Sequence, residues 1–158
     1  MVKHIDATRT FDAPVEKVWA LWTDAELVKQ WWGPDFFTCP LARIDFREGG
    51  TSLVSMKSAQ FMAGMEHFTS WTYTRIVPHE LIEFIQNLVN PDGSPADPTQ
   101  YGLPADFPKD VQTIVKFRAL GNDRTEMTIE ESADFGTIAA FAKIGLDQMI
   151  ARFPTPAS

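Results

Sequence analysis

The chain has 158 residues, a net charge of −7, and ordinary hydrophobic (44%) and charged (22%) fractions. This length predicts one domain over residues 1–158, with a core large enough to need no disulfide. The negative charge argues against nucleic-acid and anionic-membrane surfaces, because phosphate binding depends on Lys and Arg. The N-terminus has no signal-peptide pattern and no apolar stretch reaches about 18 residues, so we expect a cytoplasmic protein without membrane insertion.

Residues of the kinds that bind metals or act as nucleophiles are few. Cys39 is the single cysteine, which predicts no internal disulfide and no thiolate cluster. The spacing of His4, His67 and His79 does not bring them together as metal ligands. Motifs of serine hydrolases, zinc proteases and phosphate-binding loops are missing. We therefore predict no metal site, no cofactor and no catalytic motif.

The first third of the chain predicts one strand and two short helices. Residues 3–11 alternate apolar and polar side chains, as in a strand. Pro14 stands at the first position of a helical pattern. Thr23 and Glu26 have capping-box spacing, which predicts a second helix from Asp24 to about residue 32. Four tryptophans are expected to pack the corner between these helices: Trp19, Trp22, Trp31 and Trp32.

The remainder predicts six strands and one long helix. The strands are expected at about 37–47, 51–57, 66–77, 81–89, 111–119 and 125–132, and the short turns between most of them favour antiparallel pairing. The helix is expected over 138–153, with Thr137 as its N-cap and Pro154 at its end. Its apolar stripe is Ile138, Ala142, Gly145, Leu146, Met149 and Phe153.

This order of elements predicts an α+β helix-grip architecture, in which one curved antiparallel sheet wraps around the C-terminal helix. A sheet and helix so arranged tend to enclose an apolar cavity. On the last strand, Met127, Ile129 and Glu131 are expected to face inward. We predict that the cavity walls and the ligand-binding residues are the bulky inward side chains Trp71, Tyr73, Phe84, Phe117, Met127 and Met149, with the mouth near Trp31 or Phe37.

Four segments carry a family resemblance: RTFDAPVEKVWALWTDAELVKQWWGP, DFREGG, RIVPHELIEF and RTEMTIEES. Together they resemble the activator of Hsp90 ATPase homologue family, part of the SRPBCC group that shares the helix-grip fold of START lipid-binding domains and polyketide cyclases. The resemblance covers nearly the whole chain. Its most specific part is WWGP followed by Asp45, Arg47, Gly49 and Gly50. It implies a single-domain member that binds a hydrophobic small molecule, with chemistry added in some relatives.

Three functions remain open. The protein carries, senses or sequesters an apolar small molecule; or it is a cyclase, isomerase or hydrolase acting on an aromatic or polyketide-like substrate; or it is a chaperone-binding module similar to Hsp90 co-chaperones. For an enzyme, His67, Trp71, Tyr73 and Arg75 share one strand face and are the candidates for proton transfer. We favour the interpretation that Trp71 and Tyr73 are core, with His67 and Arg75 in water at the sheet ends.

Two long loops, 58–66 and 90–108, interrupt the sheet. Five prolines in the second exclude regular structure. A loop of this length is a tolerated surface insertion, the interpretation we favour, or else a lid or subunit contact. The apolar residues that both loops carry motivate the hypothesis of a homodimer: Phe61, Met62 and Met65, then Tyr101, Leu103 and Phe107.

Overall fold

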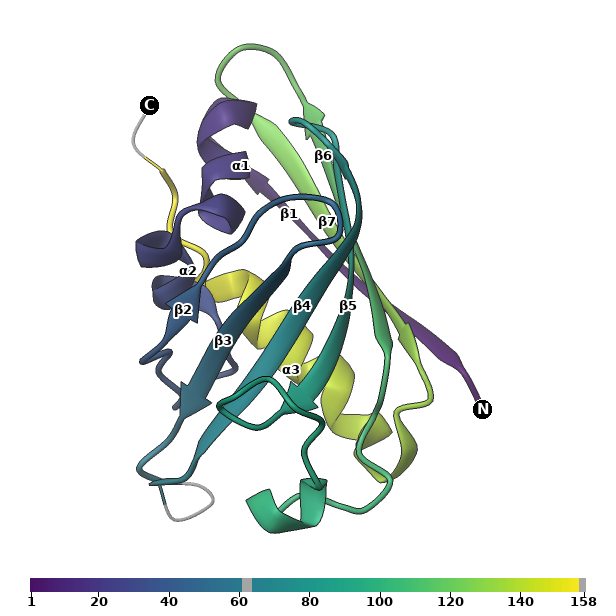
Figure 1. Ribbon diagram of the computed structural model, residues 1–158. Helices are drawn as coiled ribbons and strands as arrows, with labels where there is room; N and C mark the ends of the chain where they lie inside the picture. Colours follow the sequence, from purple (N-terminus) through teal and green to yellow (C-terminus); the bar gives the residue numbers. More distant parts are fainter. Residues whose placement is uncertain (61–63, 157–158) are drawn as a thin grey trace.

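The computed structural model describes residues 1–60 and 64–156 (Figure 1). In that part of the chain, seven antiparallel strands form one sheet in the order β1-β7-β6-β5-β4-β3-β2. The α3 helix (Ala139–Arg152) crosses the concave face of this sheet, and α1 (Val15–Thr23) and α2 (Ala25–Trp31) lie together beside one end (Figure 1). The predicted helix-grip architecture is confirmed. The strands are β1 (Lys3–Phe11), β2 (Ala42–Arg43), β3 (Thr51–Lys57), β4 (Glu66–Val77), β5 (Leu81–Val89), β6 (Val111–Ala119) and β7 (Thr125–Ala133).

The first strand returns beside the last one, as predicted. It pairs with β7 along its whole length, from Lys3 opposite Ala133 to Phe11 opposite Thr125. Side chains of β1 alternate between the core and the outer face. Arg9 reaches from this strand to the end of α3, where its guanidinium donates hydrogen bonds to main-chain carbonyls of the last helical turn and of the residue after it. These bonds satisfy carbonyls that a helix end leaves without an internal partner.

The corner between α1 and α2 is packed by tryptophan. The indole N–H of Trp31 donates to the carbonyl of Leu21 at 2.8 Å, and its ring stacks on Phe153 with centroids 4.0 Å apart. This contact joins the corner to the end of α3. The predicted packing role is confirmed for all four tryptophans, each at most 9% exposed: Trp19, Trp22, Trp31 and Trp32.

The cap of α2 differs from the predicted one. Asp24 is the N-cap, and its carboxylate accepts a hydrogen bond from the backbone N–H of Glu26 at 2.9 Å. Thr23 belongs to the last turn of α1, so it does not have the extended backbone that an N-cap needs. The capping box beginning at Thr23 is therefore wrong by one residue.

The predicted strand over 37–47 is also wrong in extent. Only Ala42–Arg43 pairs as a strand, against β3. Before it, main-chain hydrogen bonds continue only at single residues, from Ser55 N–H to the Leu41 carbonyl and between Thr38 and Lys57. Serine hydroxyls of β3 take other N–H groups of the segment: Leu41 N–H donates to Ser55 Oγ at 3.1 Å, and Asp45 N–H donates to Ser52 Oγ at 3.0 Å. Alternation of side chains does not reveal this substitution of hydrogen-bond partners.

The helix α3 is buried over its C-terminal half. Leu146, Met149, Ile150 and Phe153 belong to the hydrophobic core, whereas Phe141 and Ile144 are exposed. Across residues 1–60 and 64–156, the helices are all too short or too polar to pass through a lipid bilayer. The two halves of α3 thus have different surroundings, and the first half borders the candidate site.

Candidate ligand-binding site

The N-terminal half of α3 does not close onto the sheet. Ile138, Ala142 and Gly145, predicted as part of a continuous buried stripe, instead line a pocket of about 650 Å³, here called the large pocket. Strand residues Met56, Thr69 and Leu88 form the wall opposite the helix. The apolar side chains that complete the walls and mouth are Phe36, Phe37, Leu103, Phe107, Phe141 and Ile144.

The loop 90–108 forms one wall of the large pocket. Its short helix η2 (Pro98–Tyr101) ends beside β4, where Nε2 of His67 lies 3.0 Å from the carbonyl oxygen of Tyr101. A carbonyl oxygen only accepts, so Nε2 carries the proton of this hydrogen bond. Leu103 and Phe107 are half-buried and line the pocket. Leu103 and Phe107 therefore form part of a pocket wall and are not a free surface insertion. Phe61 and Met62 of the other loop lie outside the described residues.

The same loop caps the start of α3. Asp106 accepts hydrogen bonds from the backbone N–H of Thr137 at 2.9 Å and from its hydroxyl at 2.7 Å. The predicted N-cap role of Thr137 is wrong, because Thr137 lies inside the short helix η3 (Gly136–Ile138) and donates to Asp106. Gly136 allows the close approach: it has a φ of +54°, and a Cβ there would lie 2.7 Å from Asp106 oxygens. A carboxylate at this position also complements the helix dipole.

A second pocket of about 180 Å³, here called the small pocket, adjoins the large one. Gln86 of β5 and Glu131 of β7 bring polar groups to it from the concave face of the sheet. Trp32, Phe107 and Phe135 add aromatic walls. The two pockets share six lining residues, so one elongated molecule can occupy both: Met56, Thr69, Leu88, Phe107, Ile138 and Ala142.

The carboxyl group of Glu131 is held by an amide. Nε2 of Gln86 donates to Glu131 Oε2 at 2.9 Å and to Thr113 Oγ1 at 2.8 Å. Burial raises the pKa of Glu131 to about 7, and the hydrogen bond from Gln86 opposes part of this rise. Among the described residues that line either pocket there is no Lys and no Arg. The two pockets thus combine apolar walls with one carboxyl group that titrates near neutral pH.

The six predicted wall residues lie together in the core instead of lining either pocket. Their exposed fractions are between 0% and 8%. Tyr73 donates or accepts a 2.7 Å hydrogen bond with Ser52, and burial raises the pKa of its hydroxyl to about 12. Contact of these six residues with a ligand stays a prediction: Trp71, Tyr73, Phe84, Phe117, Met127 and Met149. Of the two predicted mouth residues, Phe37 lines the large pocket.

The four residues considered for an enzyme on β4 do not meet. Trp71 and Tyr73 are core, as favoured. Arg75 is exposed, following a register shift between Tyr73 and Arg75. His67 is only 4% exposed, so the expectation that it lies in water is wrong. The loop 90–108 covers it.

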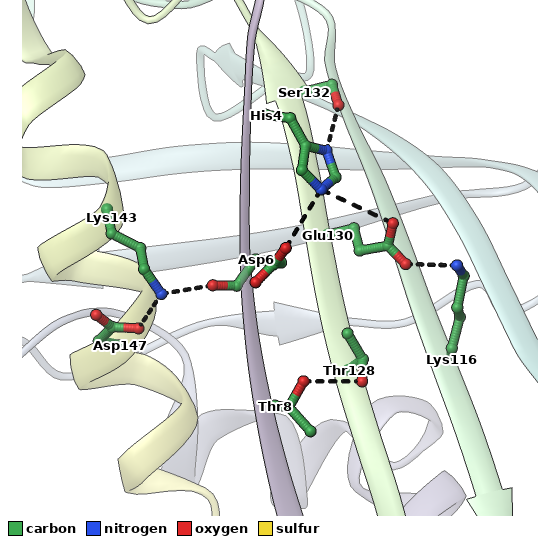
Figure 2. Close-up of polar contacts among 9 residues, drawn as sticks. All are labelled: His4, Asp6, Thr8, Lys116, Thr128, Glu130, Ser132, Lys143 and Asp147. Carbon is green, nitrogen blue, oxygen red and sulfur yellow. Dashed lines mark hydrogen bonds and ion pairs between the residues drawn. The ribbon is translucent and has the colours of Figure 1, made fainter.

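A separate polar group lies on the outer face of the sheet (Figure 2). Nδ1 of His4 is 3.1 Å from Ser132 Oγ, and its Nε2 is 3.4 Å from Asp6 Oδ2. Lys143 of α3 donates to the carbonyl of Asp6 and to Asp147 (Figure 2). These residues are mostly exposed and line neither pocket. In residues 1–60 and 64–156, no three His, Cys, Asp or Glu side chains gather as metal ligands.

Comparison with known proteins agrees with this architecture. The sequence profile described as Activator of Hsp90 ATPase homolog 1-like protein matches residues 12–153. The chain belongs to this family. Its members take the SRPBCC helix-grip fold seen here, so the resemblance in the sequence is confirmed. No curated protein matches the chain in sequence.

Solved structures similar to this family member share its fold at low identity. A protein from Arthrobacter aurescens is 24% identical, with a TM-score of 0.77 over 94% of this chain and 81% of the other. The AHSA1 protein from Silicibacter pomeroyi is 16% identical, with a TM-score of 0.71 over 95% and 94%. DynU16, a protein of the dynemicin biosynthetic locus, is 19% identical, with a TM-score of 0.62 over 95% and 45%.

Gln86 and Asp106 were not predicted from the sequence as residues of the candidate site, and Glu131 was predicted to face inward without a function. A signal for Glu131 was present, because a carboxylate at an inward position between apolar strand residues has no bulk water around it. Gln86 carries a weaker signal, since it alternates with Ile82 and Phe84 on β5. The role of Asp106 depends on a contact across 31 residues of sequence, which local pattern does not reveal.

Proposed function

We propose that this protein binds an apolar small molecule in the large pocket, beside the N-terminal half of α3. The observation that carries the proposal is a pocket of about 650 Å³ with apolar walls from residues 34–37, the sheet, the loop 90–108 and the helix α3. Three apolar side chains at the pocket are strongly exposed: Phe36 (67%), Phe141 (69%) and Ile144 (52%). Exposed apolar residues gathered at one place are typical of a binding surface.

The size of the pocket supports a useful affinity. A ligand that loses ~300 Å² of apolar surface there gains several kcal/mol, at about 25 cal/mol per Å². Association has its own entropic cost, so a dissociation constant on the order of micromolar is expected. The SRPBCC fold family commonly binds hydrophobic ligands, which is consistent with this use of the pocket.

The pocket chemistry supports binding over catalysis. An acid–base enzyme needs groups that meet at the reacting atoms. The titratable residues among the described lining of the two pockets are Asp35, His67 and Glu131, and no contact joins any two of them. A cyclase, isomerase or hydrolase therefore remains the alternative, with Glu131 as its single candidate acid or base.

A homodimer that covers the exposed residues at the pocket mouth is proposed as well. Phe36, Phe141 and Ile144 would provide its apolar contacts. The same residues are what a chaperone-binding module would use. A monomer mass in light scattering at micromolar concentration would rule out the dimer.

The binding proposal is tested by filling the pocket from the helix. Gly145 lines the large pocket, and a Cβ built on it meets no atom within 4 Å. Gly145→Trp should therefore place an indole in the pocket, while replacing a helix glycine gains up to ~1 kcal/mol of helix stability. We expect saturable binding of a fluorescent apolar probe to disappear without a fall in melting temperature. Ala140→Trp is the matched control, because Ala140 is exposed on the same helix and lines neither pocket.

A third variant distinguishes the large pocket from the wall predicted by sequence. Met149 is 8% exposed in the core, so Met149→Trp overpacks and costs ~1–3 kcal/mol of stability. Loss of probe binding in Met149→Trp, together with retained binding in Gly145→Trp, would move the site into the core. Absence of saturable binding to the wild-type protein would overturn the proposal.

A further inference from the structure

We propose that the small pocket binds a protonated amine, with the Glu131 carboxylate as its counter-ion, so that the ligand is an apolar molecule ending in an ammonium group. This inference rests on the proposed function, since the apolar body of the same molecule would occupy the large pocket. The two pockets share walls on β3, β4, β5, α3 and the loop 90–108. A ligand lying in one can thus extend into the other.

The charged hydrogen-bonding group in the described lining of the small pocket is an acceptor, the Glu131 carboxylate. Gln86 has already donated its amide group to Glu131 and Thr113. Asn87, which also lines this pocket, exchanges two hydrogen bonds with Asp110. Glu131 Oε1 has no hydrogen-bond partner among residues 1–60 and 64–156, and it is not among the inaccessible atoms. Among the described lining side chains, the Thr69 hydroxyl and the second N–H of the Asn87 amide remain as neutral donors, whereas Glu131 is the charged acceptor, which suits a cationic donor group on the ligand.

The surroundings of Glu131 lack a positive charge. The described residues lining the two pockets include no Lys or Arg, and the other carboxylate among them is Asp35. On neighbouring elements, Lys116 pairs with Glu130, and Lys143 is bonded to Asp6 and Asp147. A carboxylate in an apolar site is costly unless a cation accompanies it. Since the described walls do not supply that cation, a ligand that brings one stabilises the ionised form.

The aromatic walls favour the same class of ligand. Trp32, Phe107 and Phe135 line the same small pocket as Glu131. Aromatic faces attract ammonium groups through the ring quadrupole, most strongly for Trp and in sites shielded from water. The indole N–H of Trp32 is buried without a partner and inaccessible, so it offers no donor to an anionic head group. Together, the Glu131 carboxylate and the aromatic rings favour a ligand that ends in an ammonium group over one that ends in a carboxylate or a hydroxyl group.

The test compares three probes that differ only in the head group. Octylamine, 1-octanol and octanoate are each used to displace a fluorescent apolar probe from the wild-type protein at pH 8, where the amine is protonated. We expect octylamine to bind about tenfold more tightly than 1-octanol and octanoate to bind most weakly, since one charged hydrogen bond in such a site corresponds to about that factor. Glu131→Gln should remove the preference for the amine and leave 1-octanol unchanged. Asp35→Asn removes the same charge from the large pocket and should keep the preference.

A second measurement needs no variant. The preference of the wild-type protein for octylamine over 1-octanol should grow between pH 5 and pH 8, as the Glu131 carboxyl ionises. Equal binding of amine and alcohol at both pH values, or a preference that survives Glu131→Gln, would overturn the inference while leaving the proposed function in place. If the fluorescent probe shows no saturable binding and none of the three molecules displaces it, both the inference and the proposed function fail.

Discussion

Two neighbouring glutamates on β7 have opposite surroundings. Glu130 faces the outer side of the sheet, where its carboxylate lies 2.6 Å from Nζ of Lys116 (Figure 2). Glu131 faces the concave side, where Gln86 is its hydrogen-bond donor and the described pocket walls contain no cation. One step along a strand reverses the face of a side chain. The same residue type therefore forms a surface ion pair at one position and lines a pocket at the next.

The comparison shows which of the two carboxylates has the larger effect on the free energy of unfolding. A surface ion pair such as Glu130–Lys116 contributes little, because the Lys116 ammonium is exposed and water screens the interaction. Glu131 is largely shielded from water without gaining a cation among the described residues, so its ionised form destabilises the folded protein. In the proposed complex, the ammonium group of the ligand would recover this energy. Three experiments test the difference between the two glutamates.

The largest effect is expected from Glu131→Gln. Burial raises the pKa of Glu131 from an ordinary value of 4.5 to about 7, so the folded protein holds a proton that the unfolded chain releases between these pH values. The contribution of Glu131 to the free energy of unfolding is therefore complete below pH 4.5 and lost as pH rises to 7. The variant should lack this decline and be more stable at pH 8 by ~2–3 kcal/mol, allowing for contact with water in the pocket.

Urea unfolding of wild type, Glu131→Gln and Glu130→Gln between pH 5 and pH 8 measures this difference. Glu130→Gln is the matched control, since it changes the same functional group one residue away on the outer face. A parallel pH dependence of all three proteins would contradict the assignment of the raised pKa to Glu131.

A smaller effect is expected from Gln86→Leu. The amide of Gln86 lowers the pKa of Glu131, so its removal should shift that pKa above 7 and leave the carboxyl neutral at neutral pH. Losing the hydrogen bonds to Glu131 and Thr113 should cost about 1–3 kcal/mol, the usual range for buried groups left without a partner. Carboxyl carbon NMR titration, with Glu131→Gln to assign the signal, measures the shift. An unchanged Glu131 titration would show that Gln86 does not influence it.

The smallest effect is expected from Lys116→Met. Removal of the Nζ atom that lies 2.6 Å from Glu130 should change the free energy of unfolding by less than about 1 kcal/mol. The decline in stability between pH 4.5 and 7 that belongs to Glu131 should persist, because Lys116 lies on the other face of the sheet. A large loss of stability, measured by urea unfolding at pH 7, would mean that the outer-face pair is more than a surface contact.

The order of helices and strands was predictable because local sequence signals mark most of their ends. Alternation over 66–77 and 81–89 gave strands with the observed bounds. The short extent of the strand within 37–47 was not predictable, since the Ser52 and Ser55 hydroxyls accept hydrogen bonds from N–H groups that a continuous strand would direct to main-chain carbonyls. Such replacements depend on which residues a turn brings together, and the sequence pattern of one segment does not contain that information.

The position of the pocket was predicted less well than the fold, because the volume of the bulky residues was overlooked. Bulky inward residues such as Trp71 and Phe84 were expected to surround a cavity, but large side chains fill space and pack on one another. The pocket opens instead where the helix stripe carries the small residues Ala142 and Gly145. Its remaining wall comes from the loop 90–108, whose position depends on long-range contacts such as the one between Asp106 and Thr137. Small residues on an otherwise apolar helix face were the better signal.

The contact of Lys143 with the main chain of β1 has a consequence for how copies of the protein meet. A sheet with two ends exposes unpaired main-chain groups there, and these can recruit a strand from another molecule and begin aggregation. The β2 edge is protected by its length, since it has 2 residues. The β1 edge has 9 residues, and Lys143 occupies the carbonyl of Asp6 within it. The helix that borders the pocket thereby removes one main-chain acceptor from the long edge, which makes strand addition at that point less favourable.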